Sequence, residues 1–248
     1  MNIDKKYYQE INENLTNTIQ DTNISAPNKK VGKVRDAYFL NDKVVMISTD
    51  RQSAFDRVLA AIPYKGAVLN SVSAWWFKKT EHLFPNHLIS TPDPNVSIVE
   101  KCTVFPVEFV VRGYITGTTD TSLWTVYNNG DREYCGNSLP EGLKKNDKLD
   151  KPMLTPTTKD KVHDRPVSRE EIIDLGLMSA EDYDLAAKMS LDLFAFGQET
   201  AKKNGLILVD TKYEIGTDSK GKIKFVDEIH TPDTVSYTHL TLPTTCSV

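Results

Sequence analysis

Two acidic residues in the last fifth of the chain, Glu214 and Asp227, are candidate ligands for a divalent cation. They lie in the runs GLILVDTKYEIG and KIKFVDEI, which are joined by Thr-Asp-Ser-Lys-Gly and are typical of a β-hairpin. If residues 219–222 form a four-residue loop, Asp218 pairs with Ile223 and Glu214 lies opposite Asp227. Opposed carboxylates repel each other unless a cation lies between them, and Mg²⁺ prefers carboxylate and phosphate oxygens.

A salt bridge from Glu214 to Lys212, on the same strand face, is the structural alternative. The metal interpretation requires a phosphate site nearby. Gly32, Lys33 and Arg35 in the segment VGKVRD could provide one, because glycine permits close backbone approach and the two cations would share a strand face. A solvated basic strand is the other interpretation of this segment. The Walker A pattern does not occur in the chain.

Hydrophobic spacing predicts the elements that must position these residues. Apolar residues every four positions from Ile3 to Ile19 predict an amphipathic helix that packs on a core. Two apolar runs in residues 31–48 predict a β-hairpin, and residues 104–111 predict another strand. Ser179 is the predicted cap of a helix that ends at Gly205, with an apolar face formed by Leu185, Met189, Leu193 and Phe196.

Residues 128–164 are rich in Gly, Asn, Pro, Lys and Asp and show little periodicity, which favours functional loops. The 248 residues, 39% of them hydrophobic and 26% charged, fit a globular protein of one large domain or two smaller ones. The net charge of −4 argues against nucleic-acid binding, and three cysteines without C-x-x-C spacing argue against a disulfide framework or a thiolate zinc site. No leader or membrane-spanning run is apparent, so we expect a cytoplasmic protein.

Six motifs occur in an order that identifies a family. They are GKVRD, STDRQSAFD (48–56), PVEFVVRGYITG (106–117), TPTTK (155–159), DTKYEIG (210–216) and VDEIHTPD (226–233). Together, from about Val31 to Thr234, they resemble the SAICAR synthetase (phosphoribosylaminoimidazole-succinocarboxamide synthase) family. The resemblance implies an α+β, two-lobed fold similar to ATP-grasp and kinase folds. A β-rich nucleotide-binding lobe with an N-terminal helix (1–108) would precede an α/β substrate- and Mg-binding lobe (109–234).

The resemblance also implies an ATP-dependent ligase of purine biosynthesis. It would join L-aspartate to the carboxylate of carboxyaminoimidazole ribotide (CAIR) and release ADP and phosphate. A carboxylate does not react with an amine at neutral pH, so the family is expected to activate it by phosphoryl transfer from Mg-ATP, which depends on positioning and charge neutralisation. Its partners would be these small molecules, with no nucleic acid and no membrane, and a homo-oligomer is left open.

Site residues follow from the family motifs position by position. ATP would contact Gly32, Lys33, Arg35, Glu214, Asp227 and the connection around Glu108, with Glu214 and Asp227 holding Mg²⁺. Catalytic roles fall to Lys33, Arg112, Lys159 and Asp164. Substrate binding falls to Ser53, Asp56, Arg112, Gly117, Thr118, Lys159, Asp164, Lys212 and Asp233, with Asp210 supporting the metal ligands.

Some of these assignments have alternatives. Asp56 could cap the following chain, Gly113 and Gly117 could form an ordinary turn pair, and Asp164, phosphate or water could take the amine proton in place of His163. The chain departs from the family after Thr234, where Ser, Arg and an aromatic residue are expected. Residues 235–248, VSYTHLTLPTTCSV, hold no Arg or Lys, and we expect an aberrant, non-native tail that weakens ribotide binding.

Other functions fit parts of the same pattern. One is a nucleotide-binding Mg-ATP phosphotransferase or ligase of similar fold that acts on another small acid. Another is a catalytically impaired, truncated member of the family, or a nucleotide-binding module without catalysis. The last is an interaction protein that uses the apolar stripe of the N-terminal helix.

Overall fold

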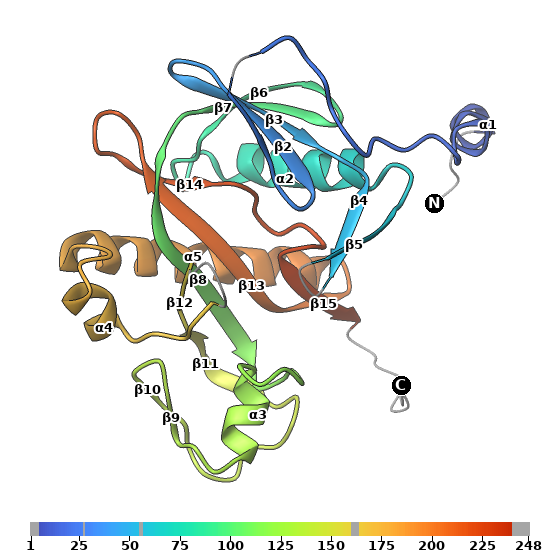
Figure 1. Cartoon of the computed structure of the whole chain (residues 1–248). Coiled ribbons are helices and arrows are strands. Elements are labelled where there is room, and N and C mark those ends of the chain that lie inside the picture. Colours follow the sequence, from blue (N-terminus) through green and yellow to red (C-terminus); the bar gives the residue numbers. More distant parts are fainter. Residues whose placement is uncertain (1–4, 27, 55–56, 160–163, 240–248) are drawn as a thin grey trace. The chain divides into compact units, whose positions relative to one another are not determined.

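A computed structural model describes residues 5–26, 28–54, 57–159 and 164–239 of the chain (Figure 1). The chain divides into two compact units, described separately below. Unit 1 comprises Met1–Lys79 and His87–Lys101, and unit 2 comprises Thr80–Asn86 and Cys102–Val248. The elements in chain order are α1 (Lys5–Glu13), β1 (Lys29–Val31), β2 (Arg35–Phe39), β3 (Lys43–Ser48), β4 (Arg51–Ala54), β5 (Arg57–Ala61), α2 (Lys65–Thr80), β6 (Leu88–Asp93), β7 (Val96–Glu100), β8 (Thr103–Tyr114), α3 (Leu123–Asn128), β9 (Glu133–Tyr134), β10 (Asn137–Ser138), β11 (Lys148–Leu154), β12 (Thr157–Thr158), α4 (Arg169–Asp174), α5 (Ala180–Lys203), β13 (Leu206–Thr217), β14 (Ile223–Val226) and β15 (Val235–His239).

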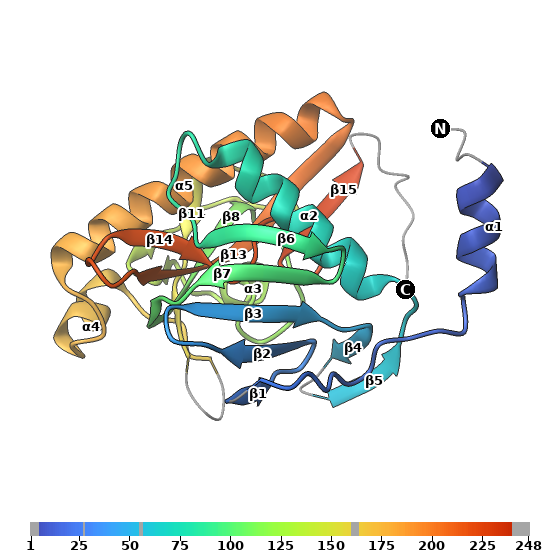
Figure 2. The same ribbon diagram turned by 90° about the horizontal axis from the view of Figure 1, so that it is seen from above.

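Unit 1 contains a five-stranded sheet in the order β1-β2-β3-β7-β6, with every neighbouring pair antiparallel. Figure 2 shows these strands side by side in that order. The predicted hairpin in residues 31–48 is confirmed as β2 and β3, with Arg35 paired to Ser48. Helix α2 is tied to the sheet by Asn70, whose amide donates to the Pro94 carbonyl at 2.9 Å and accepts from the Ser97 hydroxyl at 2.7 Å.

The N-terminal helix is shorter than its spacing predicts. Helix α1 ends at Glu13, and the side chain of Asn14 donates to the Glu10 carbonyl while the Asn17 N–H bonds the Asn14 carbonyl. Asparagine side chains compete with the backbone ladder in this way and end helices. The side chains of Ile11 and Leu15 are exposed, so the predicted core packing of the stripe is wrong at these positions. Ile3 lies outside the described residues.

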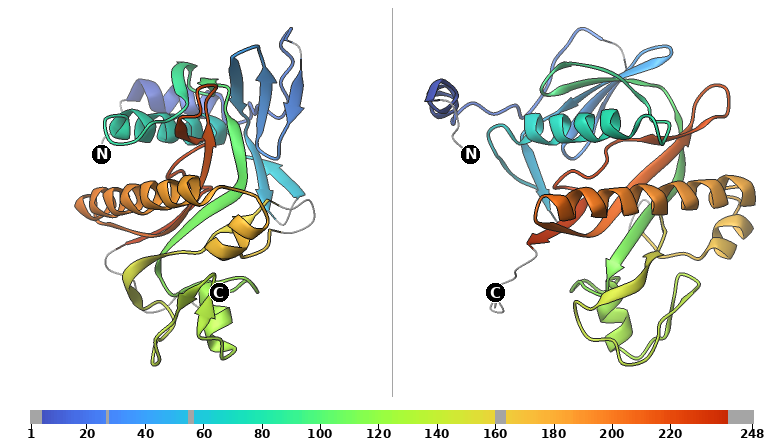
Figure 3. Two further views of the ribbon diagram at one scale, coloured as in Figure 1. Left: turned by 90° about the vertical axis from the view of Figure 1, so that its left-hand side faces the viewer. Right: turned by 180° about the vertical axis from the view of Figure 1, so that it is seen from behind.

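Unit 2 is built on two 12-residue antiparallel strands, β8 and β13, at the centre of a six-stranded sheet. Side chains alternate between the two faces of a strand. Phe109 on β8 and Tyr213 on β13 are fully buried on one face, and α5 packs against these strands; the rings of Phe109 and Tyr183 lie 5.7 Å apart. Figure 3 shows α5 running across β13. The chain therefore has the predicted α+β composition.

Helix α5 confirms the prediction of a helix between Ser179 and Gly205. The Ser179 hydroxyl accepts from the Asp182 N–H, and Gly205 follows the helix with a φ of +73°. The buried face differs in detail, because Leu185 is exposed and Phe194 is buried. One helix position requires glycine: a Cβ at Gly197 would lie 2.5 Å from the ring of His230.

Two chain segments have more structure than the sequence indicates. The region of low periodicity contains β9, β10, β11 and β12 and part of a small apolar cluster formed by Ile115, Leu123, Tyr127, Tyr134, Leu139 and Leu149. Val235–His239 forms β15 and pairs with β13, although the sequence shows no strand periodicity there. The rest of the predicted aberrant tail lies outside the described residues. None of the helices in the described part of the chain combines the length and the apolar character needed to cross a membrane.

We expect Gly197→Ala to destabilise unit 2. In an open helix this change stabilises by about 1 kcal/mol, but here the added methyl group would overlap His230 and Leu208, and overpacking of this kind costs about 1–3 kcal/mol. Urea unfolding of both chains measures the difference. Glu199→Ala, at an exposed position of α5, is the matched control and should leave stability near that of the parent. A more stable Gly197→Ala chain would contradict the packing described here.

Candidate active site

The face of the unit 2 sheet that points away from α5 is charged. Glu108 on β8 pairs directly with Glu214 on β13, and Arg112 pairs with Asp210. Lys212 lies on β13 between Asp210 and Glu214. The alternation that buries Phe109 and Tyr213 against α5 therefore places these five charged side chains together on the opposite face.

Two lysines compensate the opposed carboxylates. The Lys212 ammonium lies 2.7 Å from a Glu108 oxygen and 3.6 Å from a Glu214 oxygen. Lys159, which directly follows β12, forms an ion pair with the other Glu214 oxygen. Burial alone would lower the pKa of Lys212, but the carboxylates of Glu108 and Glu214 raise it above its usual value. The salt bridge between Lys212 and Glu214, the structural alternative to a metal, is thus present in the structure.

The predicted hairpin register is wrong by one residue. Glu214 pairs with Val226, and Thr217 pairs with Ile223. The reason lies in the turn, where the Asp218 carboxylate accepts from the N–H groups of Lys220 and Lys222 and so stabilises a longer loop. The acidic residue that lies directly opposite Glu214 is Glu108, on β8, the other strand that pairs with β13.

Asp227 nevertheless lies close enough to act on Glu214. It follows the last residue of β14 with a φ of +61°, a left-handed conformation that is rare outside glycine. Burial, and next the charge of Asp227, raise the pKa of Glu214, although Lys159 and Lys212 act in the opposite direction. Among the described residues no group of three or more His, Cys, Asp or Glu side chains is arranged to hold a metal ion. The two carboxylates together provide oxygen donors of the kind that Mg²⁺ accepts when phosphates and water complete its shell.

The loop after β14 is held by a hydrogen bond within the loop and by hydrogen bonds to β13. The Thr231 hydroxyl donates to the buried Glu228 carboxylate at 2.9 Å, and the Lys212 N–H donates to the Thr234 carbonyl at 3.0 Å. His230 also has a positive φ, of +53°, and its Nε2 forms a hydrogen bond with the Tyr213 hydroxyl. The loop that carries Asp227 is thereby anchored to β13.

Arg112 is oriented by Thr155, whose hydroxyl accepts from the guanidinium Nε at 2.9 Å. The described residues offer no hydrogen bond to its terminal nitrogens, which leaves them available for an anion. Gly117 adopts a φ of +105°, and a Cβ there would lie 2.4 Å from Ser122, so the position needs glycine on both counts. Gly113 lies within β8 against Phe194, so the turn-pair alternative is wrong for it.

The basic segment of unit 1 differs from the expected strand. β1 ends at Val31 and β2 begins at Arg35, so Lys33 lies in the connecting turn and does not share a strand face with Arg35. The Gly32 N–H donates to the Arg35 carbonyl at 2.7 Å and closes this turn, and a Cβ at Gly32 would lie 2.8 Å from that oxygen. Lys33 is exposed and Arg35 is half-buried.

The other predicted site residues occupy varied positions. Ser53 is half-buried in β4, whereas Thr118, Asp164 and Asp233 are exposed in loops. Asp56 and His163 lie outside the described residues. Glu108 lies in the middle of β8 within unit 2, and not in a connection between the units. Its pairing with Glu214 was missed, although an acid inside the apolar run of residues 104–111 could have indicated it.

Comparisons with known proteins agree on one family. A family model described as SAICAR synthetase matches residues 28–241. The phosphoribosylaminoimidazole-succinocarboxamide synthase of Legionella pneumophila (strain Lens) is 58% identical over 219 residues, which cover 88% of this chain and 70% of the relative. The chloroplastic synthase of Arabidopsis thaliana is 57% identical over 232 residues, which cover 92% of this chain and 56% of that relative.

Solved structures show the same likeness. A SAICAR synthase from Saccharomyces cerevisiae in complex with SAICAR matches with a TM-score of 0.78 and 30% identity, over 89% of this chain and 79% of that chain. A type-2 SAICAR synthetase in complex with ADP matches with a TM-score of 0.72 and 27% identity, over 86% of this chain and 84% of that chain.

The burial of His230 has a consequence for the pH dependence of stability. Burial lowers the pKa of this imidazole to about 3, below its usual 6.5. As pH falls below 6.5 the unfolded chain binds a proton at this position and the folded chain does not, so stability is lost by about 1.4 kcal/mol per pH unit. We expect His230→Gln to flatten the fall in unfolding free energy between pH 6.5 and 5. Urea unfolding at several pH values measures this slope.

His82→Gln is the matched control, because His82 is an exposed histidine of the same unit. It should leave the slope of the parent chain unchanged. Equal slopes for His230→Gln and the parent would show that His230 titrates in the folded chain.

Proposed function

The chain belongs to the SAICAR synthetase family, and we propose that it joins L-aspartate to the carboxylate of CAIR at the expense of ATP, forming SAICAR, ADP and phosphate. The observation that carries the proposal is the group of Glu108, Lys159, Lys212 and Glu214 on the polar face of the β8–β13 pair. Largely buried carboxylates that are compensated by lysines are suited to a Mg-nucleotide. The sequence places these side chains inside the family motifs.

Glu214 and Asp227 are the residues that would hold Mg²⁺. The fit rests on the donors, because both side chains are carboxylates and Asp227 directly follows Val226, the residue that pairs with Glu214. Burial and the charge of Asp227 also raise the pKa of Glu214, which a divalent cation would reverse. When bound, Mg²⁺ would neutralise charge on the transferring phosphoryl group. Lys212 would keep Glu108 from repelling Glu214, so that the site tolerates three acidic side chains before any ligand arrives.

The remaining charged groups are proposed to bind the two acidic substrates. Arg112, oriented by Thr155, presents a guanidinium fork suited to a carboxylate or phosphate of CAIR. The exposed Lys33 and the half-buried Arg35 are proposed to bind ATP phosphates. Lys159 and Asp164 remain proposed catalytic residues, and Ser53, Asp56, Thr118 and Asp233 remain proposed substrate contacts.

The chemistry follows from the low reactivity of a carboxylate toward an amine. Transfer of the ATP γ-phosphoryl group to the CAIR carboxylate would turn one of its oxygens into a leaving group. Attack by the aspartate amine would then form the amide and release phosphate, and the amine proton would pass to Asp164, phosphate or water. The chain's own contribution is to hold the reacting groups together and to compensate their charges. A cytoplasmic location and a homo-oligomer remain proposals from the sequence.

We expect ADP release to require ATP, Mg²⁺, CAIR and L-aspartate together. A coupled ADP-release assay in which each component is omitted in turn tests this. Glu214→Gln should lower kcat about 10²-fold or more, because removal of one electrostatic group at a reacting centre has effects of this size. Glu199→Gln on the exposed side of α5 is the matched control and should keep parental activity.

Other outcomes would point to other functions. ADP release that depends on a different small acid would favour another phosphotransferase or ligase of this fold. Tight Mg-ATP binding without turnover would favour a nucleotide-binding module. Parental activity in Glu214→Gln would exclude the assigned role of that carboxylate.

A further inference from the structure

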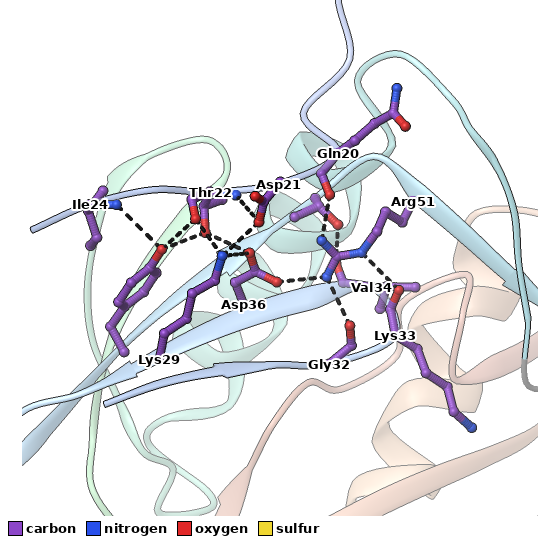
Figure 4. A network of polar contacts seen from close by, with 12 residues as sticks. Gln20, Asp21, Thr22, Ile24, Lys29, Gly32, Lys33, Val34, Asp36 and Arg51 are labelled. Atoms are coloured by element: carbon purple, nitrogen blue, oxygen red, sulfur yellow. Dashed lines mark hydrogen bonds and ion pairs between the residues drawn. The ribbon is translucent and has the colours of Figure 1, made fainter. Parts of the chain in front are cut away.

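The turn that carries Lys33 is held in place by hydrogen bonds that three of its consecutive backbone carbonyl groups accept. The Arg51 guanidinium donates from Nη2 to the Gly32 carbonyl at 2.9 Å and from Nε to the Lys33 carbonyl at 3.1 Å. The Val34 carbonyl accepts from both the N–H and the hydroxyl of Thr49, at 2.9 and 2.8 Å. Figure 4 shows the guanidinium between the Gly32 and Lys33 carbonyl groups and Asp36. Each carbonyl from Gly32 to Val34 is therefore fixed by the segment 49–51.

Arg51 is itself held in place by a buried acid. Its Nη2 donates to Asp36 at 2.8 Å and its Nη1 to the Gln20 carbonyl at 2.7 Å. Asp36 is completely buried, and its other carboxylate oxygen accepts from the Thr22 hydroxyl at 2.6 Å and lies 3.0 Å from the Lys29 ammonium. Only the planar fork of an arginine can reach this set of acceptors, because an ammonium group has its donors on a single atom.

The fixed carbonyls also determine the direction of the next N–H groups. In a trans peptide the C=O of one residue and the N–H of the following residue point in opposite directions. The N–H groups of Lys33 and Val34 therefore point away from Arg51. Successive backbone N–H groups in a turn are a common binding element for phosphate.

We propose that Arg51 is a positioning residue for nucleotide binding, which holds the Gly32 and Lys33 carbonyl groups so that the N–H groups of Lys33 and Val34 face the phosphates of ATP. Arg51 does not touch the nucleotide, and Asp36 fixes its orientation. The inference rests on the proposed ATP site at Lys33. It assigns a function to a buried arginine whose contacts otherwise serve only the fold.

Arg51→Lys tests the inference, because it keeps the charge and removes the fork. We expect the KM for ATP to rise about tenfold or more, while the KM values for L-aspartate and CAIR stay within about twofold, since lost hydrogen bonds to a charged group have effects of this order. Backbone hydrogen exchange at residues 32–35 should become faster in the absence of nucleotide. Arg169→Lys is the matched control, because Arg169 also forms a two-pronged ion pair, with Asp184, at 2.7 and 2.8 Å.

Thr49→Val is a milder second variant for the case in which Arg51→Lys does not fold. It removes only the hydroxyl bond to the Val34 carbonyl and keeps the shape of the side chain and the backbone bond. We expect a rise of about two- to fivefold in the KM for ATP, in the same direction as for Arg51→Lys. Thermal unfolding of each variant distinguishes a general loss of stability from a change confined to the nucleotide.

The outcomes separate this inference from the proposed function. If the parent chain shows no aspartate-dependent ADP release, the proposed function fails. If the parent is active and a folded Arg51→Lys or Thr49→Val chain binds ATP with parental KM, the positioning role is excluded. Equal rises in the KM of all three substrates would show that Arg51 serves only the fold of unit 1.

Discussion

The charged face of unit 2 depends on one constraint, the direct pairing of Glu108 with Glu214 across β8 and β13. Opposed acids in a sheet repel, and both side chains are largely buried, so neither can be screened well by water. Lys212 and Lys159 resolve this by contacting the two carboxylates from different elements. Both lysines must be in place to compensate the two acids. This requires β12, which directly precedes Lys159, to lie where it does, and β13 to keep its register.

The division of the sheet into two faces makes this arrangement possible. On one face, Phe109, Tyr213 and Ile215 are fully buried, and α5 packs on β8 and β13. The other face carries the charged residues, which would be too costly in an apolar core unless they were paired. Gly113 and Gly197 let the helix approach closely, since a Cβ at either position would overlap a neighbour. The tight packing of α5 on one face of β8 and β13 therefore fixes the backbone that carries the charged side chains on the other face.

The sequence predicts more of the elements than of their register. The helix capped by Ser179 and the strand that ends in YEIG follow from local spacing and were confirmed. The acid inside the apolar run of residues 104–111 marks Glu108 as unusual, but local spacing does not pair it with Glu214, because that pairing depends on the Asp218 turn and on a strand some 100 residues earlier in the chain. The end of α1 was missed for a local reason, since the competing side-chain bond of Asn14 leaves no mark on the hydrophobic pattern. The roles of individual site residues remain predictions from the family motifs.

Both units contain carboxylates that are compensated by basic side chains, but the degree of burial of these carboxylates differs. In unit 2, lysines with flexible stems compensate largely buried carboxylates, and such pairs can be rearranged when a ligand changes the local charge. In unit 1, the completely buried Asp36 is compensated by the rigid fork of Arg51, whose remaining donors are used by backbone carbonyls. A buried pair of this kind adds little to stability but is costly to break, which favours one fixed backbone conformation. We infer that a rigid ion pair shapes the turn at Lys33, whereas an adaptable one keeps the acids of β8 and β13 ready for a cation.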